Sequence, residues 1–308
     1  MSTLDDSKPD LMRRALDGLN RHVADSGLST RAKIALTCRA LFDAGHDSGL
    51  AGQITARAER PGTYYTQQLG LGFDEITEDN LLLVDEDLNV LAGTGMANPA
   101  NRFHSWIYRG RPDVNCIVHT HPFHVAALSM LEVPLVVSQM DIAPLYDDCA
   151  FLADWPGVPV GNEEGEIISG ALGDKKAILL AHHGQVVAGA SVEEACSLAM
   201  LIERGAKLQL AAMAAGTIAP LPEVIARLQQ AAPLRRVAPD PGEAVRLEFE
   251  LDRKRVRGCF TFAILLASHF RHRTQKVLHM VPDLMADDIS LGKIAGRAVA
   301  GFHFIVET

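Results

Sequence analysis

Hydrophobic positions in two stretches of the chain follow helical spacing. Residues 29–46, STRAKIALTCRALFDAGH, open with Ser29 as a helix cap, place most of their apolar residues on one helical face and end near Gly45. Residues 191–216 keep this spacing for longer, with Ser191 as the cap and Glu193 and Glu194 in the first turn. Both segments are predicted to be helices.

Between these helices, short apolar runs alternate with glycine, aspartate and asparagine, which is typical of successive strands. Strands are expected at residues 52–57, 63–73, 80–86, 89–93 and 116–121, and two more within KKAILLAHHGQVVAG, residues 175–189. Residues 103–111, FHSWIYRGR, are expected to form a helix, and residues 122–159 show a mixed pattern. Together, these helices and strands predict an α/β fold.

A proline-rich stretch at residues 220–241 is expected to end the main domain. We therefore expect three parts. An N-terminal arm covers residues 1–28, the main domain covers residues 29–219, and a proline-rich connection with a C-terminal extension covers residues 220–308. The sequence does not reveal a role for the extension.

The composition narrows the class of protein. The 308 residues are 48% hydrophobic and 22% charged, and the net charge of -9 disfavours nucleic acid or an anionic membrane as a partner. The five cysteines form no Cys-x-x-Cys pair, and no run approaches the roughly 20 apolar residues of a membrane span. The amino terminus, MSTLDDSKPD, lacks the basic start of a signal peptide. We expect a cytoplasmic protein that acts on a small molecule.

Three histidines follow an apolar run in VNCIVHTHPFH, residues 114–124. Residues two apart in a strand project from the same face, so His119 and His121 can present two imidazoles to one point. A third imidazole can come from His183, because Gly184 lets that corner approach closely. Three neutral imidazoles leave coordination positions open, as at a catalytic metal site. The alternative is a core strand that happens to end in imidazoles.

At these residues the chain resembles the class II aldolase/adducin family. The resemblance runs from about Arg31 to Ala215, through GLAGQITAR, GLGFDEITEDNLLLVDEDLNVLAG, IYRGRPDVNCIVHTHP and ILLAHHGQVVAG. It implies a three-layer α/β/α domain with a mostly antiparallel central sheet flanked by helices, usually in a homotetramer with active sites at subunit interfaces. It also implies that a divalent metal ion, zinc before manganese, cobalt or iron, is bound by His119, His121 and His183.

The chain departs from the family pattern at two places. The family's aldolases carry a glutamate four residues before the histidine that matches His104, and this chain has Ala100 there. The sugar-phosphate members also carry two serines before that glutamate and an asparagine in the first loop, whereas this chain has Asn98, Pro99 and Gln53. These departures argue against a sugar phosphate as the substrate.

The other candidate residues divide into two groups. The substrate-binding candidates are Gly52 and Gln53, from the family's first loop, and Arg102. The planar guanidinium of Arg102 suits a carboxylate, and the alternative for this arginine is a purely structural role. The candidates for proton transfer are a histidine near the missing glutamate and two residues of the loop SQMDIAPLYDD: His104, Tyr146 and Asp141.

The favoured function is a divalent-metal-dependent carbon–carbon lyase, an aldolase or a decarboxylase, acting on a small 2-oxo or hydroxy acid through a metal-stabilised enolate. One alternative is a non-haem Fe(II) oxygenase that decarboxylates aromatic 2-oxo acids, because the family contains such enzymes and three imidazoles with open positions suit Fe(II). Another is a non-catalytic binding module like the adducin head. Dependence on oxygen separates the first two.

Overall fold

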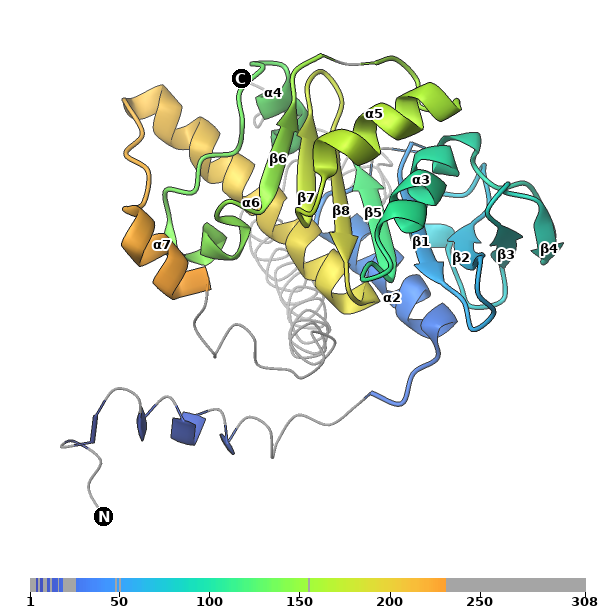
Figure 1. Ribbon diagram of the computed structural model, residues 1–308, viewed down its shortest axis with the longest axis horizontal. Coiled ribbons are helices and arrows are strands. Elements are labelled where there is room, and N and C mark those ends of the chain that lie inside the picture. Colours follow the sequence, from blue (N-terminus) through green and yellow to red (C-terminus); the bar gives the residue numbers. More distant parts are fainter. Residues whose placement is uncertain are drawn as a thin grey trace, which may run out of the picture. The chain divides into compact units, whose positions relative to one another are not determined.

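Within the part of the chain that is described, a single eight-stranded sheet carries helices on both faces (Figure 1). The computed structural model describes residues 26–230, apart from positions 48, 50 and 155, together with isolated positions between 4 and 18. The strands are β1 (Gln53–Arg57), β2 (Thr63–Gln67), β3 (Leu81–Asp85), β4 (Val90–Ala92), β5 (Cys116–Thr120), β6 (Cys149–Leu152), β7 (Ala177–Leu180) and β8 (Gln185–Gly189). The α-helices are α2 (Thr30–Asp43), α3 (Arg102–Gly110), α4 (Phe123–Ser129), α5 (Asn162–Leu172), α6 (Val192–Ala215) and α7 (Glu223–Gln230). Short 3-10 helices are η1 (Phe73–Glu75), η2 (Pro99–Asn101) and η3 (Met140–Leu145).

The sheet is mostly antiparallel, as predicted. Its strand order is β4-β3-β2-β1-β5-β8-β7-β6, and only β6 and β7 pair in parallel. Strand β5 therefore lies inside the sheet between β1 and β8, and all of its residues are buried. A continuous apolar run is typical of a strand that is covered on both faces, which explains the sequence CIV before the first histidine.

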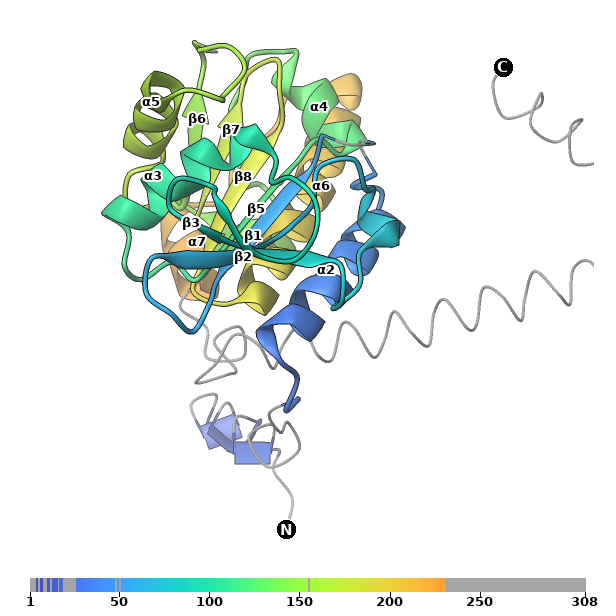
Figure 2. The same cartoon turned by 90° about the vertical axis from the view of Figure 1, so that its right-hand side faces the viewer.

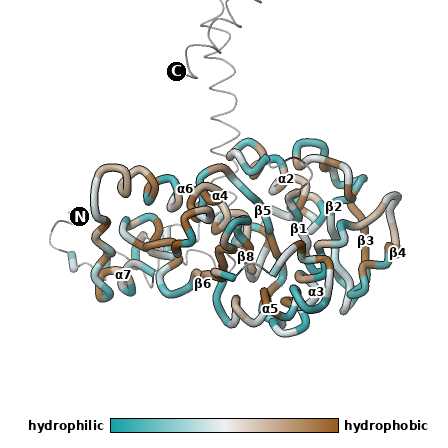
Figure 3. The backbone as a smooth tube through the Cα atoms, turned by 90° about the horizontal axis from the view of Figure 1, so that it is seen from above, coloured by the Kyte–Doolittle hydropathy of each residue, from teal (hydrophilic) through white to brown (hydrophobic). Residues whose placement is uncertain are grey.

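Helices α3 and α5 cover one face of the sheet, and α2, α4 and α6 cover the other. Figure 2 and Figure 3 show the same layers from two further directions. Successive strand residues point to opposite faces, and each face has its own apolar core. Val118 packs with side chains of α2, α4 and α6, whereas its neighbour Ile117 packs with side chains of α3 and α5. The three-layer α/β/α architecture expected from the resemblance is confirmed.

The two long helices begin at the predicted residues. The hydroxyl of Ser29 accepts a hydrogen bond from the main-chain N–H of Ala32 at 3.0 Å, and that of Ser191 accepts one from Glu194 at 3.1 Å. Each serine satisfies a main-chain donor that the first turn of a helix cannot pair internally. Both caps were visible in the sequence, and both are confirmed.

Other predicted boundaries were wrong. The strand expected over residues 63–73 ends at Gln67, because the chain turns at Gly70, whose φ of 100° is in the left-handed region. Helices α4 and α5 and strand β6 were not predicted. Helix α5 was missed because its N-cap residue is Gly161, which has no side chain to cap the helix. Instead, the carboxylate of Glu164 accepts a hydrogen bond from the main-chain N–H of Gly161 at 3.0 Å.

The first residues after the main domain's predicted end pack against it. The main-chain N–H of Leu221 donates to the carbonyl of Val137 at 2.9 Å, and Ala226 of α7 is fully buried. The expected N-terminal arm lies largely outside the described residues, and residues 231–308 of the extension lie wholly outside them. Among the described helices, none has the length and apolar character needed to cross a membrane.

Candidate metal centre

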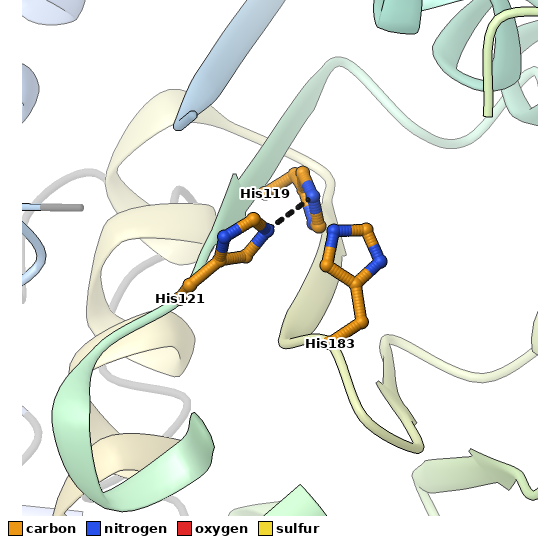
Figure 4. Close-up of side chains that lie close together, drawn as sticks. All are labelled: His119, His121 and His183. Atoms are coloured by element: carbon orange, nitrogen blue, oxygen red, sulfur yellow. Dashed lines mark hydrogen bonds between the residues drawn. The ribbon is translucent and has the colours of Figure 1, made fainter. Parts of the chain in front are cut away.

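Three imidazoles converge at one end of β5 (Figure 4). His119 belongs to β5, His121 follows directly after its last residue, and His183 lies in the corner between β7 and β8. One ligand nitrogen from each ring lies within 4.8 Å of the others, and the Nε2 atoms of His119 and His121 are 2.9 Å apart. The structure brings together the three histidines that the sequence predicted as ligands.

The tautomer of His119 is fixed by its neighbour on β8. Its Nδ1 atom lies 2.8 Å from the main-chain carbonyl oxygen of Gln185. A carbonyl oxygen only accepts, so Nδ1 carries the hydrogen and donates it. In a neutral ring, Nε2 then holds a lone pair, and this is the atom that faces His121. Histidine ligands commonly donate their other ring N–H to a main-chain carbonyl in this way.

Burial keeps the three rings neutral. His119 is 1% exposed, and burial, followed by the proximity of His121 and His183, holds its pKa well below the usual value. Burial lowers the pKa of His121 to about 4 and that of His183 to about 3. Neutral imidazole is the form that binds a metal ion, because protonation would occupy the ligating lone pair.

Gly184 allows the corner to reach His121. A Cβ atom at this position would lie 2.5 Å from the carbonyl oxygen of Thr120 and would collide with Cδ2 of His121. Any side chain here would therefore push the β7–β8 corner away from the end of β5. The glycine is required by this close approach, as the sequence predicted.

A second feature holds the same corner. His182 and Glu132 have φ values of 55° and 53°, which are uncommon for residues other than glycine. Their side chains meet, with Nε2 of His182 2.7 Å from Oε1 of Glu132, and the main-chain N–H of His182 donates to the carbonyl of Ser129 at 3.1 Å. These contacts tie the corner to the segment that ends α4.

The donor set fits a divalent transition metal. Among the histidine, cysteine and acidic side chains of the described residues, those of His119, His121 and His183 lie close enough together to hold an ion. Three imidazole nitrogens without a carboxylate or thiolate leave coordination positions for a substrate, which is the pattern of catalytic sites. The geometry therefore supports metal binding over a core strand that merely ends in imidazoles.

His104 lies on the same face of the sheet as His119. Its Nδ1 is 2.8 Å from Oγ1 of Thr55, and Thr55 shares a strand face with Gln53, which opposes His119 in the β1–β5 register. His104 is fully buried, and burial lowers its pKa to about 3. Its Nε2 has no hydrogen-bond partner among the described residues. Ala100, which stands where the family's aldolases carry a glutamate, lies in η2 just before α3 and offers no functional side chain.

The first-loop residues lie beside this strand. Gln53 is 3% exposed, and its Nε2 donates to the carbonyl of Ala51 at 2.9 Å. Gly52 lines a cavity of about 150 Å³ together with His46 and the acidic residues Asp47, Asp74 and Glu75. Like charges repel, so this cavity is unfavourable for a phosphate group.

Arg102 projects from a different side of α3 than His104. Residues two apart on a helix point in directions about 200° apart. The Nη1 atom of Arg102 is 3.2 Å from Oδ1 of Asp87, and the guanidinium lines a surface cavity of about 180 Å³ together with Trp106 and Arg109. The three histidines do not line this cavity. A role of Arg102 in substrate binding stays a prediction.

The other two candidates for proton transfer contact helices α6 and α7. Oδ2 of Asp141 lies 3.2 Å from the guanidinium of Arg204 on α6. The guanidinium of Arg227 on α7 lies 5.3 Å from the centre of the Tyr146 ring. Catalytic roles for Asp141 and Tyr146 therefore stay predictions.

Some residues around the histidines were missed by the sequence analysis. Gln185 acts through its main-chain carbonyl, which leaves no residue-specific signal. Phe103 places its ring edge-on to that of His119, with 5.3 Å between ring centres. Glu203 of α6 is hydrogen-bonded to His124 at the start of α4, although the two are 79 positions apart. Only the packed structure brings such residues together.

Comparison with known proteins gives matches over the same region. The profile of the Class II Aldolase and Adducin N-terminal domain matches residues 32–210. Over 183 residues the chain is 34% identical to a 4-hydroxy-3-prenylphenylpyruvate oxygenase/4-hydroxy-3-prenylbenzoate synthase of Streptomyces roseochromogenus subsp. oscitans, and the match covers 58% of this chain and 66% of that relative. The chain thus spans slightly less than two thirds of that relative's length.

Two further matches are to aldolases. Over 179 residues the chain is 31% identical to an L-fuculose phosphate aldolase of Escherichia coli O6:H1, and the match covers 58% of this chain and 81% of the relative. A solved structure of L-fuculose 1-phosphate aldolase from Glaciozyma antarctica PI12 superimposes with a TM-score of 0.66 and 27% sequence identity, covering 74% of this chain and 90% of that one.

Proposed function

This chain belongs to the class II aldolase and adducin family, and we propose that it is a divalent-metal-dependent carbon–carbon lyase acting on a small 2-oxo or hydroxy acid. The reaction is an aldol cleavage or a decarboxylation. The single observation that carries the proposal is the convergence of three neutral histidines, one of them with its tautomer fixed by a main-chain carbonyl.

In this proposal His119, His121 and His183 hold the metal ion. A divalent ion supplies Lewis acidity, which stabilises the negative charge that develops on a carbonyl oxygen when a carbon–carbon bond breaks. The protein's own contribution is to present three lone pairs from one buried and two half-buried histidines. Charges near the buried His119 interact more strongly than they do in solvent.

The proposed substrate class follows from what the chain lacks. The family's phosphate-binding serines are replaced by Asn98 and Pro99, and the cavity beside Gly52 is lined by three acidic residues. The acidic residues around this cavity would repel a phosphate group. A 2-oxo or hydroxy acid is better suited, because its carboxylate and its neighbouring oxygen form a chelating pair that needs no separate phosphate pocket.

We assign the proton-transfer role to His104. It lies on the sheet face that carries His119, four positions after the alanine that replaces the family glutamate. The Thr55 hydroxyl orients the ring through Nδ1, and Nε2 has no partner among the described residues. Because the lowered pKa keeps the ring neutral, Nε2 can accept or donate a hydrogen bond at the reacting oxygen according to the tautomer.

We further propose zinc as the metal, a cytoplasmic location and a homotetramer with active sites at subunit interfaces. Zinc suits three imidazole ligands. The four cysteines among the described residues are free thiols, which suits a reducing compartment. Phe123, which begins α4 two residues after His121, and Met130, which follows the end of α4, are 77% and 69% exposed, and a neighbouring subunit would cover them.

A second candidate is an Fe(II)-dependent oxygenase of aromatic 2-oxo acids. It is favoured by one observation, the 34% identity to a prenylphenylpyruvate oxygenase. Three imidazoles with open positions also suit Fe(II). The third possibility, a binding module without catalysis, is disfavoured by the retention of all three histidines in a converging geometry.

The test is a screen of the metal-loaded protein against 2-oxo and hydroxy acids, with and without oxygen. The proposal predicts carbon–carbon cleavage that proceeds equally well under nitrogen and is abolished in His121→Ala. Turnover only with iron and oxygen would replace the lyase with the oxygenase. A metal-loaded protein that cleaves no acid under either condition would contradict both.

A further inference from the structure

Helix α4 begins two residues after the ligand His121 and has no cap of its own. The helix spans Phe123–Ser129, and its N-cap residue, Pro122, makes no side-chain hydrogen bond to the first turn. The first main-chain N–H groups of a helix have no partner inside it and must be paired from elsewhere. The start of α4 therefore depends on another part of the protein.

Glu203 of α6 supplies the missing acceptors. Its Oε1 accepts from the main-chain N–H of His124 at 3.1 Å, and its Oε2 accepts from that of Val125 at 2.9 Å. Oε1 is also 2.5 Å from Nδ1 of the His124 ring. The Glu203 side chain is only 14% exposed, so these charge-assisted contacts are largely shielded from solvent. One carboxylate thus fixes two successive residues of α4.

These contacts also constrain the ligand that precedes them. Only Pro122 and Phe123 separate His121 from His124, and proline restricts the backbone at the helix start. On its other side His121 touches the corner at Gly184. The chain at His121 is therefore held between the β7–β8 corner and the carboxylate of Glu203.

We infer that Glu203 is a positioning residue for the metal centre, which sets the direction of the His121 imidazole by anchoring the start of α4. This inference rests on the metal site proposed above. Outer groups that orient a ligand commonly change metal affinity by about 10- to 100-fold when they are removed. Glu203 bonds to the start of α4 and not to a ligand itself, so loss of its carboxylate is expected to weaken metal binding by about 10-fold, the lower end of this range.

The test uses Glu203→Gln in the full chain, with cobalt(II) as the probe. The amide keeps the size of the side chain, but its one oxygen cannot replace both carboxylate oxygens, and its NH2 group cannot accept from the main-chain N–H of His124 or Val125 that it faces. Cobalt affinity is measured by competition with a chromophoric chelator, and the visible absorption of bound cobalt reports the ligand geometry. Circular dichroism and urea unfolding of the metal-free protein measure the fold separately.

Glu194→Gln provides a matched control on the same helix. Its side chain is 12% exposed, and its carboxylate accepts from the main-chain N–H of Ala190 at 2.7 Å and lies 2.6 Å from Nζ of Lys176. It thus resembles Glu203 in burial and in bonding. Ala190 follows the end of β8 that is remote from His183, so this variant is expected to lose stability without losing cobalt affinity.

We expect Glu203→Gln to bind cobalt more weakly and with an altered spectrum. Glu194→Gln should show neither change. Equal cobalt affinity in wild type and Glu203→Gln, or equal losses in the two glutamine variants, would overturn the inference alone. A wild-type protein that binds no cobalt would overturn the metal site as well. Should Glu203→Gln fail to fold, Glu203→Asp allows the same comparison.

Discussion

The Nδ1 atom of His119 donates to the carbonyl oxygen of Gln185 across the β5–β8 pair, at 2.8 Å. This bond joins the two strands whose ends carry the candidate ligands. It orients one ring through the main chain, so the direction of its free lone pair depends on strand register rather than on a flexible side chain. Substitution of Gln185 should therefore change the tautomer of His119 little, provided that the register is kept.

Replacement of Gly184 by alanine should disrupt the metal centre. The new Cβ would lie 2.5 Å from the carbonyl oxygen of Thr120 and would collide with the ring of His121, so the corner and the strand end must separate. Overpacking of this kind costs about 1–3 kcal/mol in the free energy of unfolding. We expect the variant to lose most of its bound metal during dialysis, as measured by elemental analysis.

Gly170→Ala is the control for this experiment. Gly170 lies inside α5, and a Cβ there would meet no atom within 4 Å. Alanine in a helix interior is favoured over glycine by about 0.5–1 kcal/mol, so the variant should be as stable as wild type or more stable. Normal metal content in both alanine variants would show that the close approach at Gly184 is not needed for binding.

Replacement of His104 by glutamine should separate catalysis from metal binding. His104 is not one of the three histidines placed to hold the ion, so the metal content should stay unchanged. Loss of a proton-transfer group typically lowers turnover by about 100- to 10,000-fold. The measurement is the turnover number on whichever acid the metal-loaded wild type cleaves.

Tyr108→Phe controls for disturbance of the same network. The Tyr108 hydroxyl is 3.0 Å from Oγ1 of Thr55, the group that also bonds His104. Removing this hydroxyl disturbs the packing around His104 without removing the imidazole. Equal losses of turnover in the two variants would argue that His104 is structural.

Stability of the metal-free protein should fall as the pH is lowered below the ordinary histidine pKa. His46 is 1% exposed, and burial lowers its pKa from 6.5 to about 4. Between these values the unfolded chain binds a proton at His46 and the folded chain does not, so acid favours unfolding. Each such histidine contributes a slope of about 1.4 kcal/mol per pH unit to the free energy of unfolding.

The check is urea unfolding of wild type and His46→Gln between about pH 7 and about pH 5. Glutamine can keep a hydrogen bond to the hydroxyl of Thr120, which is 2.8 Å from Nδ1 of His46. In the variant, the free energy of unfolding should fall less steeply as the pH is lowered, because about one proton fewer is taken up on unfolding. Identical slopes in the two proteins would contradict this account, because His46 would then take up its proton equally in the folded and unfolded states.

The sequence predicted those parts of the site that follow from local geometry. The two-residue spacing of His119 and His121 brought their rings together, although His121 lies one residue beyond the strand. Gly184 marked the corner that carries His183, and the structure explains the glycine by its contact with His121. The caps at Ser29 and Ser191 marked the starts of two helices.

The sequence did not reveal features that depend on long-range packing or on helical phase. The contact of Glu203 with His124 exists only because α4 packs on α6. The sequence named Arg102 and His104 as candidates without showing on which side of a helix each would lie. On α3, however, the two side chains point to different sides, and Arg102 pairs with Asp87. Proximity along a helix does not imply a shared face.

The most direct test of the metal site is elemental analysis of wild type and His119→Ala, both purified without chelators. We predict about one equivalent of a divalent transition metal per chain in wild type. His119→Ala should contain almost none while keeping the circular dichroism spectrum of the folded protein, because removal of a ligand leaves the packing of the sheet intact. A wild type that stays free of metal after reconstitution, or a variant with the same metal content as wild type, would contradict the assignment of the three histidines.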